Sequence, residues 1–131
     1  MTNYLLDTNH ANRLLDPRHP TRVRILTALG QGDTFHITPL IIAEMVFGFS
    51  VLPRAQQNHI AWQSIRPALR VVFVDEKDGI DAASLQVALR RRGRQLQTVD
   101  AFIAACALRY DLTLLTTDGD FSHPASLRVE N

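Results

Sequence analysis

The chain has 131 residues, of which 46% are hydrophobic and 21% charged, and its formal net charge is +1. This length and hydrophobic content suit one compact domain with its own core, so we expect a single domain over residues 1–131. A net charge so close to zero creates no overall field that announces a nucleic-acid partner or an acidic one. Any such partner must be recognised from local features.

Cysteine content and hydropathy exclude two further classes. Cys106 is the only cysteine, which excludes a disulfide within the chain and a zinc site built on cysteines. The N-terminus has no basic stretch followed by a long apolar run, and no segment reaches the roughly 18 apolar residues of a membrane span. We therefore expect a soluble, cytoplasmic protein without a membrane partner.

Short apolar runs alternate with helical patterns along the chain. Strands are expected at residues 4–6, 34–37, 71–74 and 112–116, with an edge strand at 126–130. Helices are expected at about residues 10–15, 23–29, 39–52, 54–66, 78–92 and 98–110. This alternation predicts an α/β fold with three layers, α/β/α, in which helices cover both faces of a mainly parallel central sheet.

Three local details complete this expectation. The uncharged run at residues 71–74 is typical of a strand buried on both faces. Thr38 and Thr98 are expected to cap the helices that follow them. In the helix over 78–92, Ile80, Ser84, Leu85 and Ala88 share one side.

Two aspartates follow predicted strands. Asp7 comes directly after the first strand and Asp118 follows the run Leu114-Leu115-Thr116-Thr117. In a parallel α/β sheet the ligand crevice lies at the carboxyl ends of the strands, so both carboxylates are expected to face it. Taken singly, each is equally well explained as a turn or helix-cap residue.

Glu44 stands in the otherwise apolar stretch Ile41-Ile42-Ala43-Glu44-Met45-Val46-Phe47, too far along its helix to serve the helix dipole. An ionised carboxylate in partly apolar surroundings costs several kcal/mol unless it is paired or bound to a metal. No basic residue lies three or four positions away to pair with it. The alternative is an edge position with Glu44 turned to water.

Asp100 begins a helical stripe with Ile103, Ala104, Ala107 and Leu108, so its carboxylate is expected to point inward. Its alternative role is to stabilise the dipole at the start of its helix. Acidic side chains gathered in one crevice repel each other by roughly 4 kcal/mol per close pair at an effective dielectric of about 20. A cation relieves that repulsion, and a purely oxygen ligand set favours Mg²⁺ or Mn²⁺.

Four stretches, in order and spacing, resemble the signature of PIN domains. They are Leu5-Leu6-Asp7-Thr8-Asn9, Ile42-Ala43-Glu44-Met45 with Gly48, Gly93 followed by Asp100-Ala101-Phe102-Ile103-Ala104-Ala105, and Leu115-Thr116-Thr117-Asp118-Gly119-Asp120-Phe121. Within PIN domains, the length and the ending are similar to the VapC toxins of toxin–antitoxin pairs. The resemblance implies a PIN-like nuclease domain over residues 1–131 that acts as a metal-dependent endoribonuclease and hydrolyses RNA phosphodiester bonds with metal-activated water.

The resemblance also implies roles and partners. It assigns catalysis and binding of Mg²⁺ or Mn²⁺ to Asp7, Glu44, Asp100 and Asp118, with Asp120 as a further metal-binding acid and Asn9 and Thr116 as polar support. Whether Asp118 or Asp120 is the fourth ligand stays open, as does a count of one or two metal ions. The implied partners are the RNA substrate, a cognate VapB-type antitoxin whose tail would cover the active-site groove, and a second copy in a homodimer.

One basic run is the remaining candidate for RNA contact. Arg90, Arg91, Arg92 and Arg94 precede Asp100 and are placed to hold RNA phosphates at the rim of the site; their alternative role is to complement a helix C-terminus. The five histidines form no pair at metal-binding spacing, so we assign them to structure or surface.

Two other functions compete with toxin activity. The first is a nuclease of the same fold that acts on DNA or in rRNA and RNA processing. The second is a phosphoryl-accepting receiver module, which needs a lysine beside its acids. The only lysine, Lys77, does not follow a strand that ends in serine or threonine.

Overall fold

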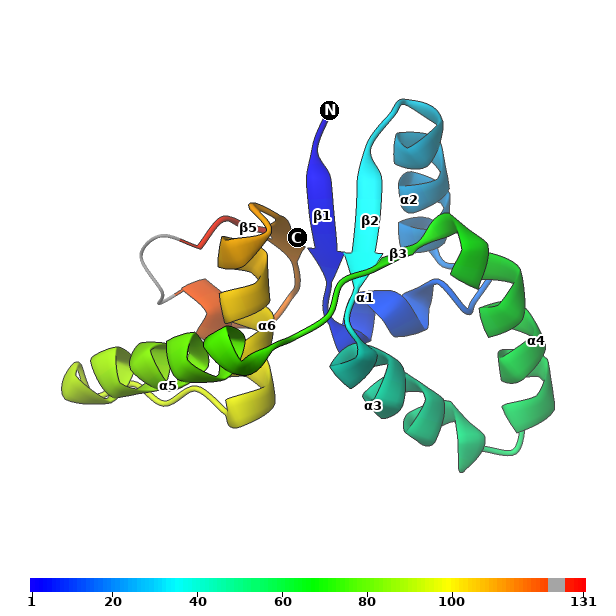
Figure 1. The fold of residues 1–131 in the computed structure, drawn as a ribbon. Coiled ribbons are helices and arrows are strands. Elements are labelled where there is room, and N and C mark those ends of the chain that lie inside the picture. Colours follow the sequence, from blue (N-terminus) through cyan, green and yellow to red (C-terminus); the bar gives the residue numbers. More distant parts are fainter. Residues whose placement is uncertain (123–126) are drawn as a thin grey trace.

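The computed structural model describes residues 1–122 and 127–131 and has a five-stranded sheet at its centre (Figure 1). The strands are β1 (Asn3–Leu6), β2 (Thr34–Ile37), β3 (Arg70–Val71), β4 (Thr113–Leu115) and β5 (Val129–Glu130). They lie in the order β3-β2-β1-β4-β5, and every neighbouring pair is parallel. The predicted parallel sheet and its C-terminal edge strand are confirmed.

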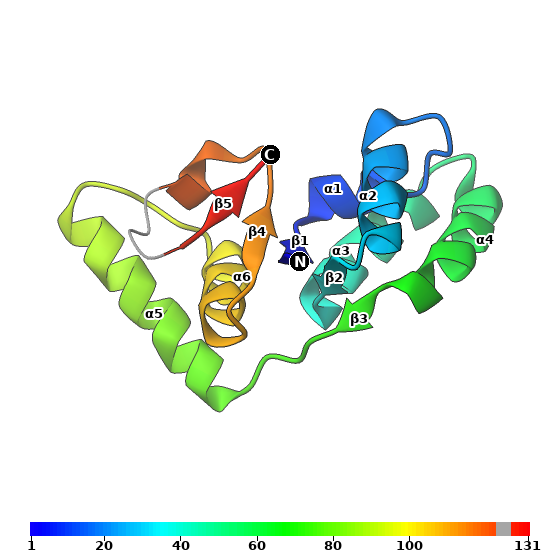
Figure 2. The ribbon, with the colours of Figure 1, turned by 90° about the horizontal axis from the view of Figure 1, so that it is seen from above.

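Helices pack on both sides of this sheet. They are α1 (Thr8–Arg13), α2 (Pro20–Gly30), α3 (Pro39–Ser50), α4 (Ala55–Ile65), α5 (Glu76–Arg91) and α6 (Thr98–Arg109), with short 3₁₀ helices η1 (Arg66–Ala68) and η2 (Gly119–Ser122). Figure 2 shows α5 and α6 on one side of the sheet and α1 and α2 on the other, as the α/β/α prediction requires. None of the helices in the described ranges is long and apolar enough to cross a bilayer.

The N-terminal caps agree with the sequence at α3 and differ at α6. Thr38 Oγ1 accepts a hydrogen bond from Ile41 N at 3.2 Å, and Pro39 opens α3 as expected. At α6 the cap is Gln97, whose side chain makes no capping hydrogen bond to the described part of the helix, and Thr98 is already helical. The prediction of Thr98 as the cap was wrong because the extended backbone ends one residue earlier than expected.

The predicted strand at residues 71–74 is largely absent. Only Arg70–Val71 pair with β2, at the edge of the sheet, and the last backbone hydrogen bond runs from Val72 N to Ile37 O at 3.0 Å. Phe73 is 64% exposed, so a strand buried on both faces was wrong. The chain has one neighbouring strand here and leaves the sheet at once for α5, which a run of apolar letters does not reveal (Figure 1).

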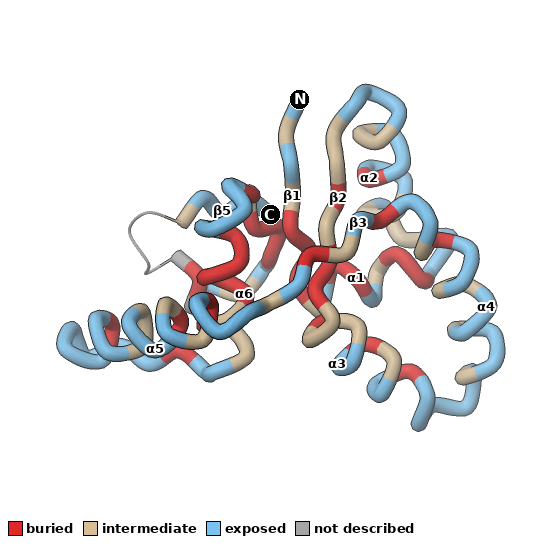
Figure 3. Tube along the Cα trace, viewed as in Figure 1, coloured by how far each residue is buried: buried red, intermediate tan, exposed pale blue. Residues whose placement is uncertain are grey.

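The core follows strands β1 and β4 and the middle of α6 (Figure 3). Leu5, Leu6 and Leu114 are completely buried, as are most of the small residues of α6. A second, smaller cluster joins α5 to α6 and to the loop between them; its members are Ala82, Leu89, Leu96, Ala101 and Ala105. The loop before α6 is therefore anchored in the interior at Leu96.

The buried face of α5 is centred on a charged residue. Asp78 is fully buried and forms a paired contact with Arg109 of α6, with Nε to Oδ1 at 2.7 Å and Nη2 to Oδ2 at 2.8 Å. Ile80, which was expected to share one side of the helix with Ser84, Leu85 and Ala88, is 63% exposed. A pattern of apolar residues alone selects the wrong side here, because the residue that α5 buries most deeply in its first turn is an aspartate.

Candidate active site

The carboxyl ends of the parallel strands meet at one edge of the sheet, below the sheet in Figure 1. Asp7 follows β1 directly, and Thr116 follows β4 directly. The two strands are neighbours, with Leu6 aligned to Leu115, and Asp7 N donates a hydrogen bond to Leu115 O at 3.3 Å. Strand pairing therefore brings Asp7 and Thr116 together, although 109 positions separate them in sequence.

Asp7 is only 6% exposed, and described neighbours satisfy its carboxylate. Oδ1 accepts hydrogen bonds from His10 N at 2.9 Å, as the cap of α1, and from His10 Nδ1 at 3.2 Å, while Oδ2 accepts one from the hydroxyl of Thr116. Because an ionised carboxylate only accepts, Nδ1 is the protonated ring nitrogen of His10 in this pair. These contacts fix the orientation of the carboxylate.

The same contacts decide its charge. Burial raises the pKa of Asp7, but the hydrogen bonds from His10 and Thr116 outweigh burial and hold that pKa below its ordinary value. Asp7 is therefore a buried, negatively charged group at neutral pH. Such a group in the crevice of an α/β sheet is a functional-site candidate on physical grounds.

Thr116 connects Asp7 to the loop that carries the last acids. Its hydroxyl donates to Asp7 Oδ2 and accepts a hydrogen bond from Asp118 N at 3.0 Å. Asp118 is half-buried, in the loop between β4 and η2. The side chain of Asp120 lies outside the described residues, so the choice between the two aspartates as a ligand remains a prediction.

Glu44 reaches the same region from α3. Its Oε2 accepts a hydrogen bond from Thr8 Oγ1 at 3.0 Å, and Thr8 is the residue after Asp7. Glu44 is exposed, so the argument from the cost of burying its charge was wrong. The buried positions of α3 are Ile41, Met45 and Phe49, and Glu44 lies beside that stripe. Gly48, one turn on, leaves open space.

Asp100 and Asn9 occupy the remaining predicted positions. Asp100 lies half-buried in the first turn of α6, followed by the buried residues Ala101, Ile103 and Ala104. The first turn of α6 and the start of α1 both lie at the lower side of the sheet in Figure 1. Asn9 is exposed in α1.

The described acids do not by themselves form a compact metal-binding group. Among the side chains that the structure describes, no three histidine, cysteine, aspartate or glutamate residues lie close enough together to hold an ion. The predicted ligands nevertheless suit a hard cation, because they are all carboxylate oxygens. A carboxylate offers about four acceptor sites, and three hydrogen bonds from described residues reach Asp7.

His10 is a site residue that the sequence analysis missed. It is 2% exposed and contacts Asp7 through both its backbone and its ring. Its position three residues after a capping aspartate was a usable signal, because the cap accepts from the N–H at that spacing.

Lys77 lines a hollow with Ala105 and Leu108 of the second half of α6, far along the helix from Asp100. That placement does not favour a phosphoryl receiver.

Comparison with known proteins identifies the architecture. The sequence matches the PIN domain over residues 4–127. The chain belongs to the PIN-domain family. This PIN domain is 24% identical over 129 residues to ribonuclease VapC2 of Rickettsia felis, covering 98% of this chain and 96% of the relative. It is 28% identical over 134 residues to toxin FitB of Neisseria gonorrhoeae, covering 97% and 96%.

Two solved structures share this fold. The crystal structure of VapBC2 from Rickettsia felis, bound to a DNA fragment from its promoter, superimposes with a TM-score of 0.87 at 23% identity, over 99% of this chain and 98% of that chain. The FitAcB structure from Neisseria gonorrhoeae gives a TM-score of 0.80 at 26% identity, over 98% and 96%. The predicted resemblance to PIN domains and to VapC toxins is confirmed.

Proposed function

We propose that this PIN domain is a metal-dependent endoribonuclease that acts as the toxin of a toxin–antitoxin pair. The observation that carries the proposal is the buried, ionised Asp7, which is linked through Thr116 to the Asp118 loop and lies next to Thr8, the partner of Glu44. Two full-length relatives are named as a ribonuclease and as a toxin, which supports this activity and role.

Asp7, Glu44, Asp100 and Asp118 would hold the ion, Mg²⁺ or Mn²⁺, with Asp120 as a further acid. A bound ion of this kind lowers the pKa of a water and stabilises charge at phosphorus. The protein supplies the orientation: His10 and Thr116 hold the Asp7 carboxylate, while Glu44 is exposed and free of the core stripe of α3. Asn9, exposed in α1 two residues after Asp7, would give polar support.

Partners follow from the same proposal. Solved relatives include toxin–antitoxin complexes from several bacteria, which supports a VapB-type antitoxin for this chain. Large apolar side chains are exposed on two separate parts of the surface, with Phe47, Val51 and Ile60 on the α3–α4 side and Phe73 and Ile80 at the start of α5. Exposed apolar surface of this kind suits protein partners, here the antitoxin and a second copy in a homodimer.

The activity is tested by incubating purified protein with end-labelled single-stranded RNA in Mg²⁺, in Mn²⁺ and in EDTA, followed by a denaturing gel. The proposal predicts internal cleavage in either metal and none in EDTA. A single-stranded DNA of the same sequence separates ribonuclease from deoxyribonuclease activity. Equal cleavage in EDTA would contradict metal dependence, and cleavage of DNA alone would replace the RNA substrate.

A further inference from the structure

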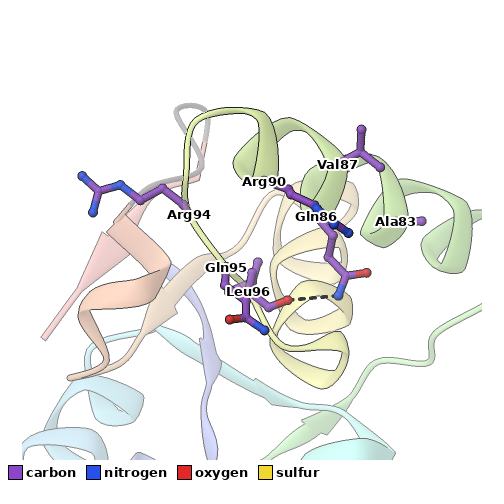
Figure 4. A pocket seen from close by; sticks show the side chains of 7 residues that line it. All are labelled: Ala83, Gln86, Val87, Arg90, Arg94, Gln95 and Leu96. Atoms are coloured by element: carbon purple, nitrogen blue, oxygen red, sulfur yellow. Dashed lines mark hydrogen bonds between the residues drawn. The ribbon is translucent and has the colours of Figure 1, made fainter.

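A pocket of about 630 Å³ lies outside the carboxylate site, between the second half of α5 and the loop that leads to α6 (Figure 4). Ala83, Gln86, Val87 and Arg90 contribute one wall from α5, and residues 94–96 of the loop contribute the other. Its size falls within the roughly 300–1,000 Å³ typical of sites for small molecules.

The loop that forms this pocket is held in place. Leu96 is 4% exposed within the small cluster between α5 and α6, and its carbonyl accepts a hydrogen bond from Gln86 Nε2 at 3.0 Å. The same nitrogen lies 3.3 Å from Thr98 Oγ1, at the first residue of α6. Gly93 makes the turn with a φ of +72°, a conformation that favours glycine. The pocket is therefore preformed and joined to the helix turn that carries Asp100.

Charge is distributed unevenly along α5. The acids Glu76, Asp78 and Asp81 lie in its first half, whereas its last turn and the residues after it hold exposed arginines at positions 90, 91, 92 and 94. Among the residues that the structure describes, those lining the pocket include two of these arginines and no acid. Guanidinium groups match phosphate geometry and stack on planar rings, so this end of α5 suits a ligand that carries both a phosphate and a planar ring.

The pocket walls complement such a ligand. Val87 and Ala83 offer apolar surface, and the Gln86 amide oxygen points away from the Leu96 carbonyl in Figure 4. In the same view Arg90 lies on the side of Gln86 and Val87, whereas the Arg94 side chain extends away from the other labelled residues. An apolar wall with amide groups accepts a base, and arginines on either side reach the adjoining phosphates.

We propose that this pocket binds an unpaired nucleotide of a single-stranded RNA, with the base against the Ala83–Val87 wall and the flanking phosphates on Arg90 and Arg94. The proposal rests on the endoribonuclease activity proposed above and defines its substrate as unpaired RNA. In a duplex the bases are stacked and paired inside a regular helix, and they would not enter a concave pocket of this kind. The pocket then holds the strand on the Asp100 side of the carboxylates.

Binding is measured by fluorescence anisotropy with a labelled single-stranded RNA in EDTA, where metal-dependent cleavage does not occur. The probes are that strand, its duplex, and an abasic strand of equal length and charge. The variants are Arg90→Gln with Arg94→Gln, and Ala83→Leu, which fills the pocket at an exposed helical position. Arg54→Gln, at an exposed arginine just before α4 on the other side of the molecule, is the control for losing one arginine elsewhere on the surface.

The double arginine variant should bind the single strand roughly tenfold more weakly. The slope of log K against the logarithm of the salt concentration should become shallower by about 1.4, which is about 0.7 for each lost phosphate contact. Ala83→Leu should weaken binding of the single strand and leave the abasic strand unchanged, while Arg54→Gln stays within about twofold of wild type. Equal affinity for duplex and single strand would overturn the proposal. The proposal would also be overturned if the double arginine variant bound the RNA as tightly as wild type does. This holds even if that variant lost affinity for an acidic protein partner.

Cleavage of the same RNA in Mg²⁺ separates this proposal from the one on which it rests. If the wild type cleaves and the arginine variant cleaves with the same KM, the pocket proposal fails and the nuclease stands. If the wild type binds through the arginines and cleaves nothing with either metal, the nuclease proposal fails and the RNA pocket stands.

Discussion

Thr116 donates a hydrogen bond to Asp7 between two neighbouring strands of the sheet, from the residue after β4 to the residue after β1. The contact satisfies a carboxylate oxygen that burial has removed from water, and it contributes to the low pKa of Asp7. The Thr116 hydroxyl also accepts a hydrogen bond from Asp118 N. One hydroxyl therefore fixes both the Asp7 carboxylate and the loop that carries Asp118. The geometry of the site therefore depends on a residue that carries no charge.

Replacing Thr116 by valine tests this link. The variant keeps the side-chain shape but leaves a buried Asp7 oxygen without its donor, at a cost of about 1–3 kcal/mol in the free energy of unfolding. Mn²⁺ affinity, measured by calorimetry, should fall as well, because the carboxylate loses its fixed orientation. Urea unfolding followed by circular dichroism gives the first quantity.

Thr117→Val is the matched control, since Thr117 is the exposed neighbour of Thr116. Its free energy of unfolding should change by less than about 0.5 kcal/mol and its Mn²⁺ affinity should match wild type. Equal effects of the two substitutions would show that the Thr116 hydroxyl has no special role.

The charge of Asp7 predicts a particular dependence of stability on pH. Because its pKa in the folded state lies below the value of about 3.9 expected in the unfolded chain, its contribution is present above that pH and is lost as the pH falls through the folded pKa. In metal-free buffer, wild type should be more stable than Asp7→Asn at pH 7, and the difference should shrink below about pH 4. Unfolding curves from pH 7 to pH 3 measure it; a constant difference would contradict the assignment of charge.

The sequence predicted the sheet, its parallel direction and the carboxylates at its edge because these depend on alternation and spacing. It did not predict the exposed setting of Glu44, since α3 is apolar nearly all round and conceals which side faces the core. It also missed His10, whose role arises from the cap geometry at Asp7. Contacts between distant residues, such as Thr8 with Glu44, depend on how α1 packs on α3 and carry no local sequence signal.

Asp78 and Arg109 illustrate the same limit in the core, and they give a third prediction. Arg109→Met would leave the fully buried Asp78 carboxylate without its cation and should lower the free energy of unfolding by about 3 kcal/mol. Adding Asp78→Asn to that variant should restore part of the loss, because the isolated charge is gone. Thermal and urea unfolding measure both changes.

Arg128→Met is the control for this ion pair. Arg128 and Asp111 form a contact of 2.7 Å, but their side chains are 57% and 85% exposed. Removing an exposed pair should cost less than about 1 kcal/mol. A loss as large as that of Arg109→Met would mean that burial does not decide the strength of these pairs.

Cys106 should be unreactive in the folded protein. Burial raises the pKa of its thiol to about 12, and the nearby Asp78 carboxylate adds to the effect. Iodoacetamide at pH 8 should therefore label the chain in urea and leave the native protein unmodified, as read by intact mass. As the pH rises above about 8.5, the unfolded thiol ionises before the folded one, so the free energy of unfolding should fall. Rapid native labelling would contradict this burial.

Glu44→Gln separates chemistry from stability at the site. Glutamine keeps an oxygen that accepts from Thr8, and the position is exposed, so the free energy of unfolding should change by less than about 0.5 kcal/mol. RNA cleavage in Mg²⁺ should fall at least about a hundredfold, because the variant lacks a negative oxygen for the ion. Glu76→Gln, at the exposed start of α5, should cleave at the wild-type rate.

The most direct test is the rate at which purified Asp7→Asn cleaves single-stranded RNA in Mg²⁺, with unfolding curves run on the same samples. The variant should remain folded and show no cleavage above the EDTA background, while wild type cuts the strand internally. Cleavage by folded Asp7→Asn at the wild-type rate would contradict the central role given to this carboxylate.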